Sequence, residues 1–150
     1  MTQVPYSYRQ PTSRRYIFTS IGAKRIDKIV DFVPLKAKNV VNLGFGDLMP
    51  DGSVNDMANS NNGDIIKVLA TIVAILKQFT YTYPKIMVFF AGSTKDRTRL
   101  YTRILKVYFL SFTKEFVVYG IVGSENDNRA ILFNPKLDIE YLGFLIQRID

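Results

Sequence analysis

An apolar helix pattern that leads directly into an apolar strand pattern is the strongest constraint on the fold. Apolar residues recur at helical spacing from Ile65 to about Phe79 or Tyr83, and Pro84 then prevents the helix from continuing. The next residues, 85–91 (KIMVFFA), form the continuous apolar run that is typical of a strand covered on both faces. A helix followed at once by such a strand predicts a sheet with helices packed on its faces. The predicted core-facing stripe of the helix comprises Ile65, Leu69, Ile72, Val73 and Leu76, widened by Val68 and Ile75.

Three strands are predicted ahead of this helix. Residues 14–20 are β-branched and aromatic, residues 24–33 alternate between apolar and polar, and residues 39–45 (NVVNLGF) form a third run. Their short links predict an antiparallel meander. Residues 1–13 are polar with two prolines and predict an extended arm, whereas the polar residues 46–62 predict a long loop.

A second helix is predicted after the apolar strand. Its N-cap is expected to be Ser93 or Thr94, because short hydroxyl side chains favour that position, and it is expected to reach about Phe112. The predicted core-facing side of this helix comprises Leu100, Ile104, Val107 and Ser111.

The remaining residues add further strands. Residues 116–122 and 129–133 predict two strands paired as a hairpin, and residues 138–149 predict a short helix, with a final strand as the alternative. The order is therefore β-β-β-α-β-α-β-β. It predicts an α+β or α/β protein with a mixed, mostly antiparallel sheet of about six strands and two main helices, in which residues 14–150 form a single domain.

The amino-acid composition excludes several classes of chemistry. The chain has no Cys and no His, which removes disulfides, zinc thiolate sites, cysteine nucleophiles and histidine general bases. The first ten residues lack the apolar core of a signal peptide, and the apolar stretch of residues 65–79 is short and interrupted by two lysines. These features predict a cytoplasmic protein with no membrane partner.

The net charge of +7 is unevenly distributed along the chain. Residues 95–114 contain six Lys or Arg and one Asp, whereas residues 46–64 contain four Asp and no cation. A basic stretch of this kind suits a polyanion, and a solvated helix face is the alternative interpretation.

The start of the second helix is the strongest candidate site. It follows a buried strand, where ligands of open α/β sheets bind, and the free N–H groups of a helix start attract anions. Cations in the first turns oppose the helix dipole unless an anion compensates them. The compensating anion is a ligand phosphate, a nucleic-acid backbone or a carboxylate of the same chain. The candidate ligand-binding residues here are Ser93, Thr94, Lys95, Arg97, Arg99, Tyr101 and Arg103.

The start of the first helix supplies the other candidate residues, Asn62, Gly63 and Asp64. Asn61 or Asn62 is the predicted N-cap, and Asp64 in the first turn would suit the helix dipole. If right-handed crossovers bring both helix starts to one end of the sheet, the two groups border a single cleft. An ion pair of Arg97 with Asp47 or Asp64 is the structural alternative to ligand binding.

The acidic loop is a weak candidate for a metal site. Asp47, Asp51, Asp56 and Asp64 offer the oxygen ligands that Mg²⁺ and Ca²⁺ prefer, but their spacing does not match an EF-hand loop. Turn and capping roles are commoner for Asp. We therefore expect no metal and no cofactor.

Three motifs in order carry a family resemblance: NLGFGD at residues 42–47, SNNGD at 60–64 with KVLAT at 67–71, and GST at 92–94 with RTRLY at 97–101. Together they resemble a family of short bacterial proteins that is classed as a domain of unknown function, over residues 16–148. The family implies no activity. The element order is also similar to the core of GNAT-type N-acyltransferases, although the glycine-rich pyrophosphate turn of those enzymes is not matched.

Three functions from different classes fit these observations. The first, which we favour, is a small basic domain that binds a phosphate-bearing ligand or nucleic acid through residues 92–101. The second is a histidine-free enzyme, either a toxin-like ribonuclease or a degenerate acyltransferase. The third is an interaction subunit that binds an acidic protein partner or forms a homodimer.

Overall fold

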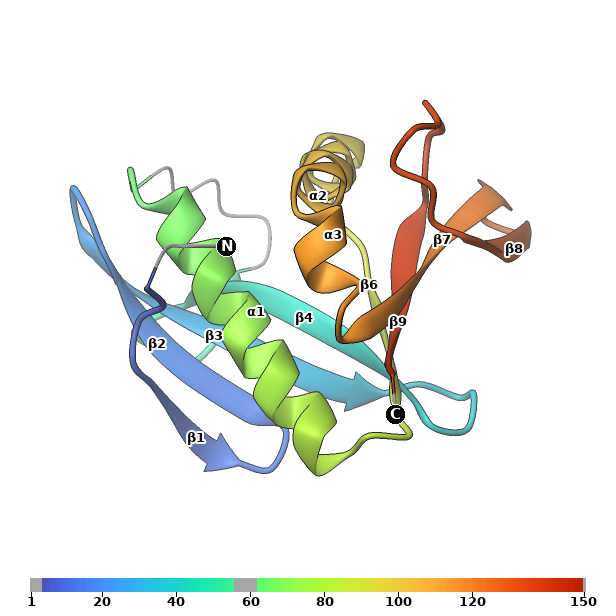
Figure 1. Ribbon diagram of the computed structural model, residues 1–150. Helices are drawn as coiled ribbons and strands as arrows, with labels where there is room; N and C mark the ends of the chain where they lie inside the picture. The colour runs from blue at the N-terminus through green and yellow to red at the C-terminus, as the bar shows by residue number, and fades with distance from the viewer. Residues whose placement is uncertain (1–3, 56–61, 150) are drawn as a thin grey trace. The chain divides into compact units, whose positions relative to one another are not determined.

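The computed structural model describes residues 4–55 and 62–149 (Figure 1). These residues form nine strands and three helices, so the predicted α+β class with a mixed, mostly antiparallel sheet is confirmed, whereas six strands was an underestimate. The chain divides into two compact units. The first unit comprises Met1–Pro34 and Asn42–Tyr83, and the second comprises Leu35–Val41 and Pro84–Asp150. The prediction of a single domain over residues 14–150 stays a prediction.

The first unit contains the predicted strands. Strand β2 (Arg15–Ile21) pairs antiparallel with β3 (Arg25–Pro34), as the alternating pattern predicted. Strand β4 (Val40–Leu48) comes next in the sheet. An additional strand, β1 (Tyr8–Thr12), lies within the predicted extended arm and pairs antiparallel with β2.

The prediction of one long loop over residues 46–62 is wrong at its start. Strand β4 continues to Leu48 and folds back into β5 (Val54–Asn55), with Leu48 opposite Val54. The turn closes because Gly52 adopts a positive φ of 88° and the Asp51 carboxylate accepts the Ser53 N–H at 2.9 Å. The polar composition of this segment therefore reflects a tight hairpin turn.

Helix α1 (Ile65–Thr82) covers one face of the strands of the first unit (Figure 1). The Phe79 ring stacks on Phe32 with ring centroids 3.8 Å apart, and Tyr16 meets Phe32 edge-on. The predicted stripe was partly wrong, because Ile65 is 52% exposed, and Thr71 and Thr80 lie in the buried face. Their hydroxyls donate to the helix carbonyls of Lys67 and Leu76, which allows burial without an unsatisfied polar group.

By length and composition alone, α1 meets the criteria for a membrane span, with a mean hydropathy of 1.4 over 18 residues. The core helix of a soluble protein meets the same criteria. The prediction that the chain has no membrane partner therefore stays a prediction.

The second unit contains a four-stranded antiparallel arrangement in the order β6-β9-β7-β8. Strands β7 (Phe116–Ser124) and β8 (Asp127–Leu132) form the predicted hairpin, and β6 (Met87–Phe90) is the predicted apolar strand. The predicted helix over residues 138–149 is wrong. Strand β9 (Gly143–Arg148) occupies this region, and its Phe144 and Ile146 are fully buried between β6 and β7.

The second predicted helix is divided into two. Helix α2 (Lys95–Val107) ends at Tyr108, and the single turn α3 (Phe109–Phe112) follows. The predicted core-facing side was also wrong, because Val107 is 73% exposed and the buried residues are Thr98, Thr102 and Leu105. Both threonine hydroxyls donate to carbonyls one turn earlier in the chain, so apolar periodicity alone could not identify the buried face.

Candidate functional site

The run of small residues before α2 has a structural explanation. Gly92 lies so close to α2 that an added Cβ would be 2.5 Å from the Arg97 Cβ and from the Thr98 nitrogen. The Gly92 N–H donates to the Thr98 hydroxyl at 3.0 Å. Thr94 is the N-cap, as one of the two predicted candidates, and its hydroxyl accepts the Arg97 N–H at 3.2 Å. This segment therefore fixes α2 against the end of β6.

Two more of the predicted ligand residues also contact the protein itself. The Arg97 guanidinium donates to the Ser93 hydroxyl at 2.8 Å. The Tyr101 ring meets Phe90 edge-on with centroids 6.0 Å apart, and burial raises the pKa of its phenol. The predicted ion pair of Arg97 with Asp47 or Asp64 would join the two units and stays a prediction.

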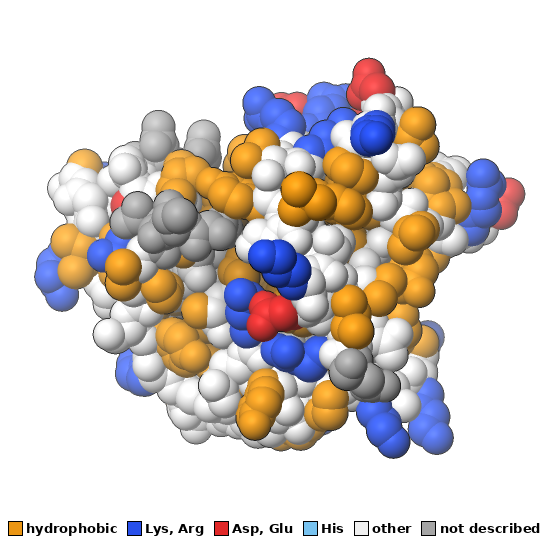
Figure 2. Space-filling view, in the orientation of Figure 1, with side chains coloured by type: hydrophobic (Ala, Val, Ile, Leu, Met, Phe, Trp, Pro, Cys, Tyr) orange, Lys and Arg blue, Asp and Glu red, His pale blue; other side chains and the backbone are white. Residues whose placement is uncertain are grey.

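The remaining predicted cations of α2, Lys95, Arg99 and Arg103, project from its solvent-facing side, and Lys106, which was not among the candidates, follows them in the last turn. At 100° per residue, Lys95, Arg99, Arg103 and Lys106 fall within an arc of about 80°. Figure 2 shows Lys and Arg side chains gathered over α2, with carboxylates among them. We call these four residues the basic face of α2.

Only one cation of the basic face is paired with carboxylates of the described residues. Arg99 lies 3.1 Å from an Asp96 oxygen and 2.9 Å from a Glu140 oxygen, and the bonds to these two carboxylates, that to Glu140 above all, raise the pKa of its guanidinium. For Arg99, carboxylates of the same chain therefore supply the compensating anion. Within residues 4–55 and 62–149, no carboxylate lies within ion-pair distance of Lys95, Arg103 or Lys106.

The second group of predicted residues lies at the start of α1. Here the Asn62 side chain binds the backbone of the turn between β2 and β3. The Asn62 side chain accepts the Lys24 N–H and donates to the Lys24 carbonyl, each at 2.8 Å. An added Cβ on Gly22 would lie 1.7 Å from the Asn62 carbonyl oxygen, so only glycine permits this approach. The prediction of Asn62 as N-cap is wrong, and the alternative Asn61 lies outside the described residues. Asp64 occupies the N-cap position.

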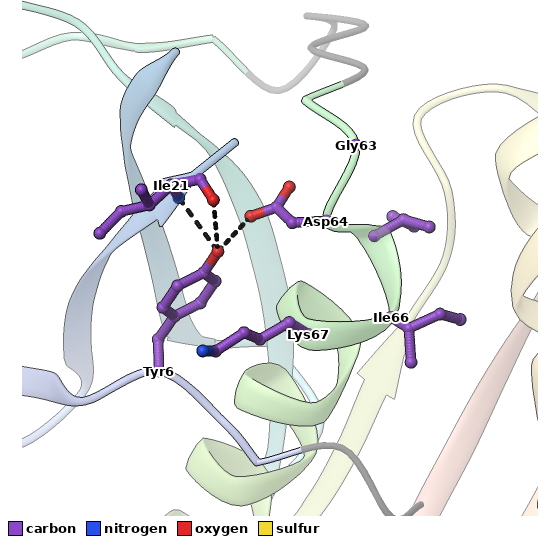
Figure 3. Close-up of a pocket in the computed structure, with 7 residues that line it drawn as sticks. Tyr6, Ile21, Gly63, Asp64, Ile66 and Lys67 are labelled. Atoms are coloured by element: carbon purple, nitrogen blue, oxygen red, sulfur yellow. Dashed lines mark hydrogen bonds between the residues drawn. The ribbon is translucent and has the colours of Figure 1, made fainter. Parts of the chain in front are cut away.

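The Asp64 carboxylate makes no capping bond because two other residues bind it. Its Oδ2 accepts a hydrogen bond from the Tyr6 hydroxyl, drawn in Figure 3, and another from the Ser20 hydroxyl, each at 2.6 Å. Burial raises the pKa of Asp64, but these bonds and the nearby Lys28 ammonium outweigh burial and leave the pKa below its ordinary value. The carboxylate is therefore ionised at neutral pH.

Tyr6 is a site residue that the sequence did not predict. Its hydroxyl accepts the Ile21 N–H at 3.0 Å while it donates to Asp64, and its own N–H donates to Thr71 at 2.8 Å. Burial and the Asp64 carboxylate raise the pKa of the phenol. These bonds hold the predicted arm against α1, and the only sequence signal for such a role is the presence of tyrosines between the two prolines of the arm.

Tyr6 and Asp64 border a surface hollow of about 470 Å³. Figure 3 shows the Lys67 side chain directed toward Tyr6, and its Nζ lies 4.5 Å from the centre of the Tyr6 ring. The hollow thus combines a carboxylate, an ammonium group and apolar surface. Its lining residues are Tyr6, Ile21, Gly63, Asp64, Ile65, Ile66 and Lys67.

A buried ion pair lies in the same unit and was also missed by the sequence analysis. Lys28 of β3 and Asp47 of β4 form an ion pair with side chains that are only 6% and 11% exposed. The Lys28 ammonium also lies 5.6 Å from the centre of the Phe45 ring. Among the described residues, no group of three or more carboxylates is placed to hold a metal ion, and Asp56 of the predicted acidic group lies outside them.

The two groups of predicted site residues belong to different units. Asn62, Gly63 and Asp64 lie in the first unit, and residues 93–103 lie in the second. Each helix start is well defined within its own unit. The single cleft that the sequence analysis placed between them stays a prediction.

These observations define a small α+β protein with a basic helix face and a separate charged hollow. The chain belongs to the Family of unknown function (DUF6934), whose model matches residues 2–149. This match confirms the resemblance to a family of unknown function. No curated protein and no solved structure matches the chain, and the similarity to N-acyltransferases stays a prediction.

Proposed function

We propose that this protein binds nucleic acid through the basic face of α2. The observation that carries the proposal is the row of Lys95, Arg99 and Arg103, in which exposed cations follow one another at a spacing of four residues. Lys106 extends the row at a spacing of three residues. Successive side chains at this spacing are neighbours on a helix surface.

The row is unfavourable for the helix by itself. Like charges four residues apart destabilise an isolated helix by about 0.2–0.5 kcal/mol per pair, and Lys95 in the first turn opposes the helix dipole. Two carboxylates offset the charge of Arg99, whereas Lys95, Arg103 and Lys106 have no such partner among the described residues. A phosphate backbone would compensate all of them and release its own counterions.

The two ion pairs of Arg99 also give the face a fixed geometry. Asp96 holds the guanidinium from within α2, and Glu140 holds it from the segment before β9. A paired central cation with an exposed cation one turn before it and one turn after it suits a repeating anionic backbone more than a single small anion. This geometry supports binding to phosphates without base recognition.

The test is a titration of labelled single-stranded RNA and double-stranded DNA with the purified protein across salt concentrations. The variant Lys95→Gln/Arg103→Gln removes two cations of the face, and Lys36→Gln/Lys38→Gln removes two exposed cations of another turn as a matched control. For each phosphate that the protein ceases to neutralise, the slope of log affinity against log salt falls by about 0.7–0.9. We therefore expect the slope of the first variant to fall by about 1.4–1.8 and that of the control to fall much less.

Two results would count against the proposal. Equal reductions in the two variants would show that net charge, and not this face, drives binding. If the protein melts as a folded protein but shows no salt-dependent binding, nucleic acid is excluded as its ligand. The alternative of an acidic protein partner is then favoured. Cleavage of bound RNA during the titration would instead support the ribonuclease alternative.

A further inference from the structure

The hollow beside Tyr6 contains an ionised carboxylate, one oxygen of which accepts no side-chain hydrogen bond from the described residues. The Tyr6 and Ser20 hydroxyls both bind Oδ2 of Asp64, so this oxygen is fixed in place. Apart from the backbone N–H of Asp64 itself, no other described residue donates a hydrogen bond to this carboxylate. Figure 3 shows the second oxygen directed away from the Tyr6 hydroxyl. A positioned acceptor of this kind suits an ammonium group.

A cation lies on the other side of the same phenol. Lys67 extends along the Tyr6 ring, 4.5 Å from its centre, and no carboxylate of the described residues lies within ion-pair distance of its Nζ. Its three N–H donors can therefore reach a carboxylate of a ligand without breaking an ion pair. The hollow thus presents one charge of each sign.

Aliphatic side chains complete the lining. Ile21, Ile65 and Ile66 are 51%, 52% and 44% exposed, although isoleucine is usually buried. All three border the hollow that also holds the charged groups. Apolar walls around a few fixed polar groups are characteristic of small-molecule sites, and a volume of about 470 Å³ lies within their usual range.

The geometry points to a binding site for a small zwitterion with an aliphatic part, such as an aliphatic α-amino acid. Its ammonium group donates to Oδ1 of Asp64, its carboxylate accepts from Lys67, and its side chain covers the exposed isoleucines. A simple anion would face the Asp64 carboxylate, and a simple cation would face the Lys67 ammonium. A ligand with both charges is complementary to both groups, and this site is independent of the basic face of α2.

The test is a titration of the full chain with L-leucine, followed by amide chemical shifts or calorimetry. Two analogues separate the charges, since isoamylamine lacks the carboxylate and 4-methylpentanoate lacks the ammonium group. We expect L-leucine to shift the amides of residues 63–67 and to bind at least about tenfold more tightly than either analogue, because each analogue lacks one charge-assisted bond.

A variant of Lys67 tests the proposal independently of the analogues, which require only the wild-type protein. Lys67→Met should reduce L-leucine affinity about tenfold and leave isoamylamine binding unchanged or stronger, whereas Lys85→Met, an exposed control, should change neither. The proposal is overturned if no ligand binds at millimolar concentration, if isoamylamine binds as tightly as L-leucine, or if Lys67→Met behaves like the control.

Discussion

The side chain of Asn62 satisfies both backbone polar groups of Lys24, which accordingly need no strand partner. Its Oδ1 accepts the N–H and its Nδ2 donates to the carbonyl oxygen, each at 2.8 Å. This pair closes the turn between β2 and β3 with an amide from a residue 38 positions later in the chain. The turn is therefore built from two distant segments.

Replacing this amide should destabilise the first unit. Asn62→Ala removes a buried side chain and both of its partly buried bonds to Lys24, so we expect the free energy of unfolding to fall by about 1–3 kcal/mol. Urea denaturation measures this change. Asn134→Ala is the control, because Asn134 is exposed and, among the described residues, its side chain bonds only to the N–H of Lys136. Equal changes in the two variants would contradict the role assigned to Asn62.

The close approach of Gly92 to α2 makes a second prediction. Gly92→Ala places a methyl group 2.5 Å from two atoms of α2, both at or near its backbone, so the clash cannot relax by side-chain rotation. We expect the free energy of unfolding to fall by about 1–3 kcal/mol. Gly44→Ala is the matched control, because its added methyl meets nothing closer than 3.9 Å. Thermal melts that shift equally for both variants would refute this explanation of the GST motif.

The hydrogen bonds to Asp64 predict a dependence of stability on acid. Because these bonds lower the folded-state pKa of Asp64, their contribution is complete above the unfolded pKa of about 4 and is lost as the pH falls through the lower folded value. The stability difference between the wild type and Asp64→Asn should therefore be constant near neutral pH and shrink below about pH 4. Urea midpoints from pH 7 to about pH 2.5 measure it. A difference that stays constant to the lowest pH would exclude this linkage.

Removal of the carboxylates around Arg99 should strengthen nucleic-acid binding. If the basic face of α2 binds nucleic acid, Asp96→Asn/Glu140→Gln should raise the affinity several-fold, because it removes two repulsive charges and frees a cation. Solvent screens such exposed ion pairs, so they contribute little to stability and folding should be nearly unchanged. Glu125→Gln/Asp127→Asn removes the same charge from the β7–β8 turn, and an equal gain there would point to net charge alone.

The buried pair of Lys28 and Asp47 should be sensitive to the removal of one partner. Lys28→Met leaves a carboxylate buried beside an apolar side chain, and we expect the free energy of unfolding to fall by about 3–5 kcal/mol. The double variant Lys28→Met/Asp47→Leu removes both charges and should recover much of this stability. Chemical denaturation of the wild type and both variants measures the loss of stability and its recovery. A double variant that is less stable than the single one would contradict the assignment.

Local patterns in the sequence predicted the elements that depend on local physics. The alternation of residues 24–33 predicted β3, Pro84 predicted the end of α1, and Thr94 was one of two predicted N-caps. In each case the determining feature involves residues that are close together in the sequence: an alternating pattern, a proline after a helix, or a helix cap. Membership of a family of unknown function was also predicted, and the family model that matches residues 2–149 confirms it.

Long-range interactions account for what the sequence could not predict. Tyr6 and Asp64 are 58 positions apart, and Lys28 and Asp47 meet only because two strands place them together. Residues 138–149 were predicted as a short helix with a final strand as the alternative, and the pairing of β9 with both β6 and β7 determined the outcome. Threonines in the buried faces of α1 and α2 concealed those faces from a search for apolar periodicity.

The position of β9 has a consequence for biosynthesis. Strands β6 and β7 each pair with β9, which is made last of the three. During synthesis, at roughly 5–20 residues per second, the nascent chain therefore carries β6 for several seconds with the hydrogen-bonding edge that β9 will occupy still open. The second unit is expected to complete its sheet only after residue 148 has left the ribosome, and until then that edge is a target for chaperones or for a neighbouring nascent chain.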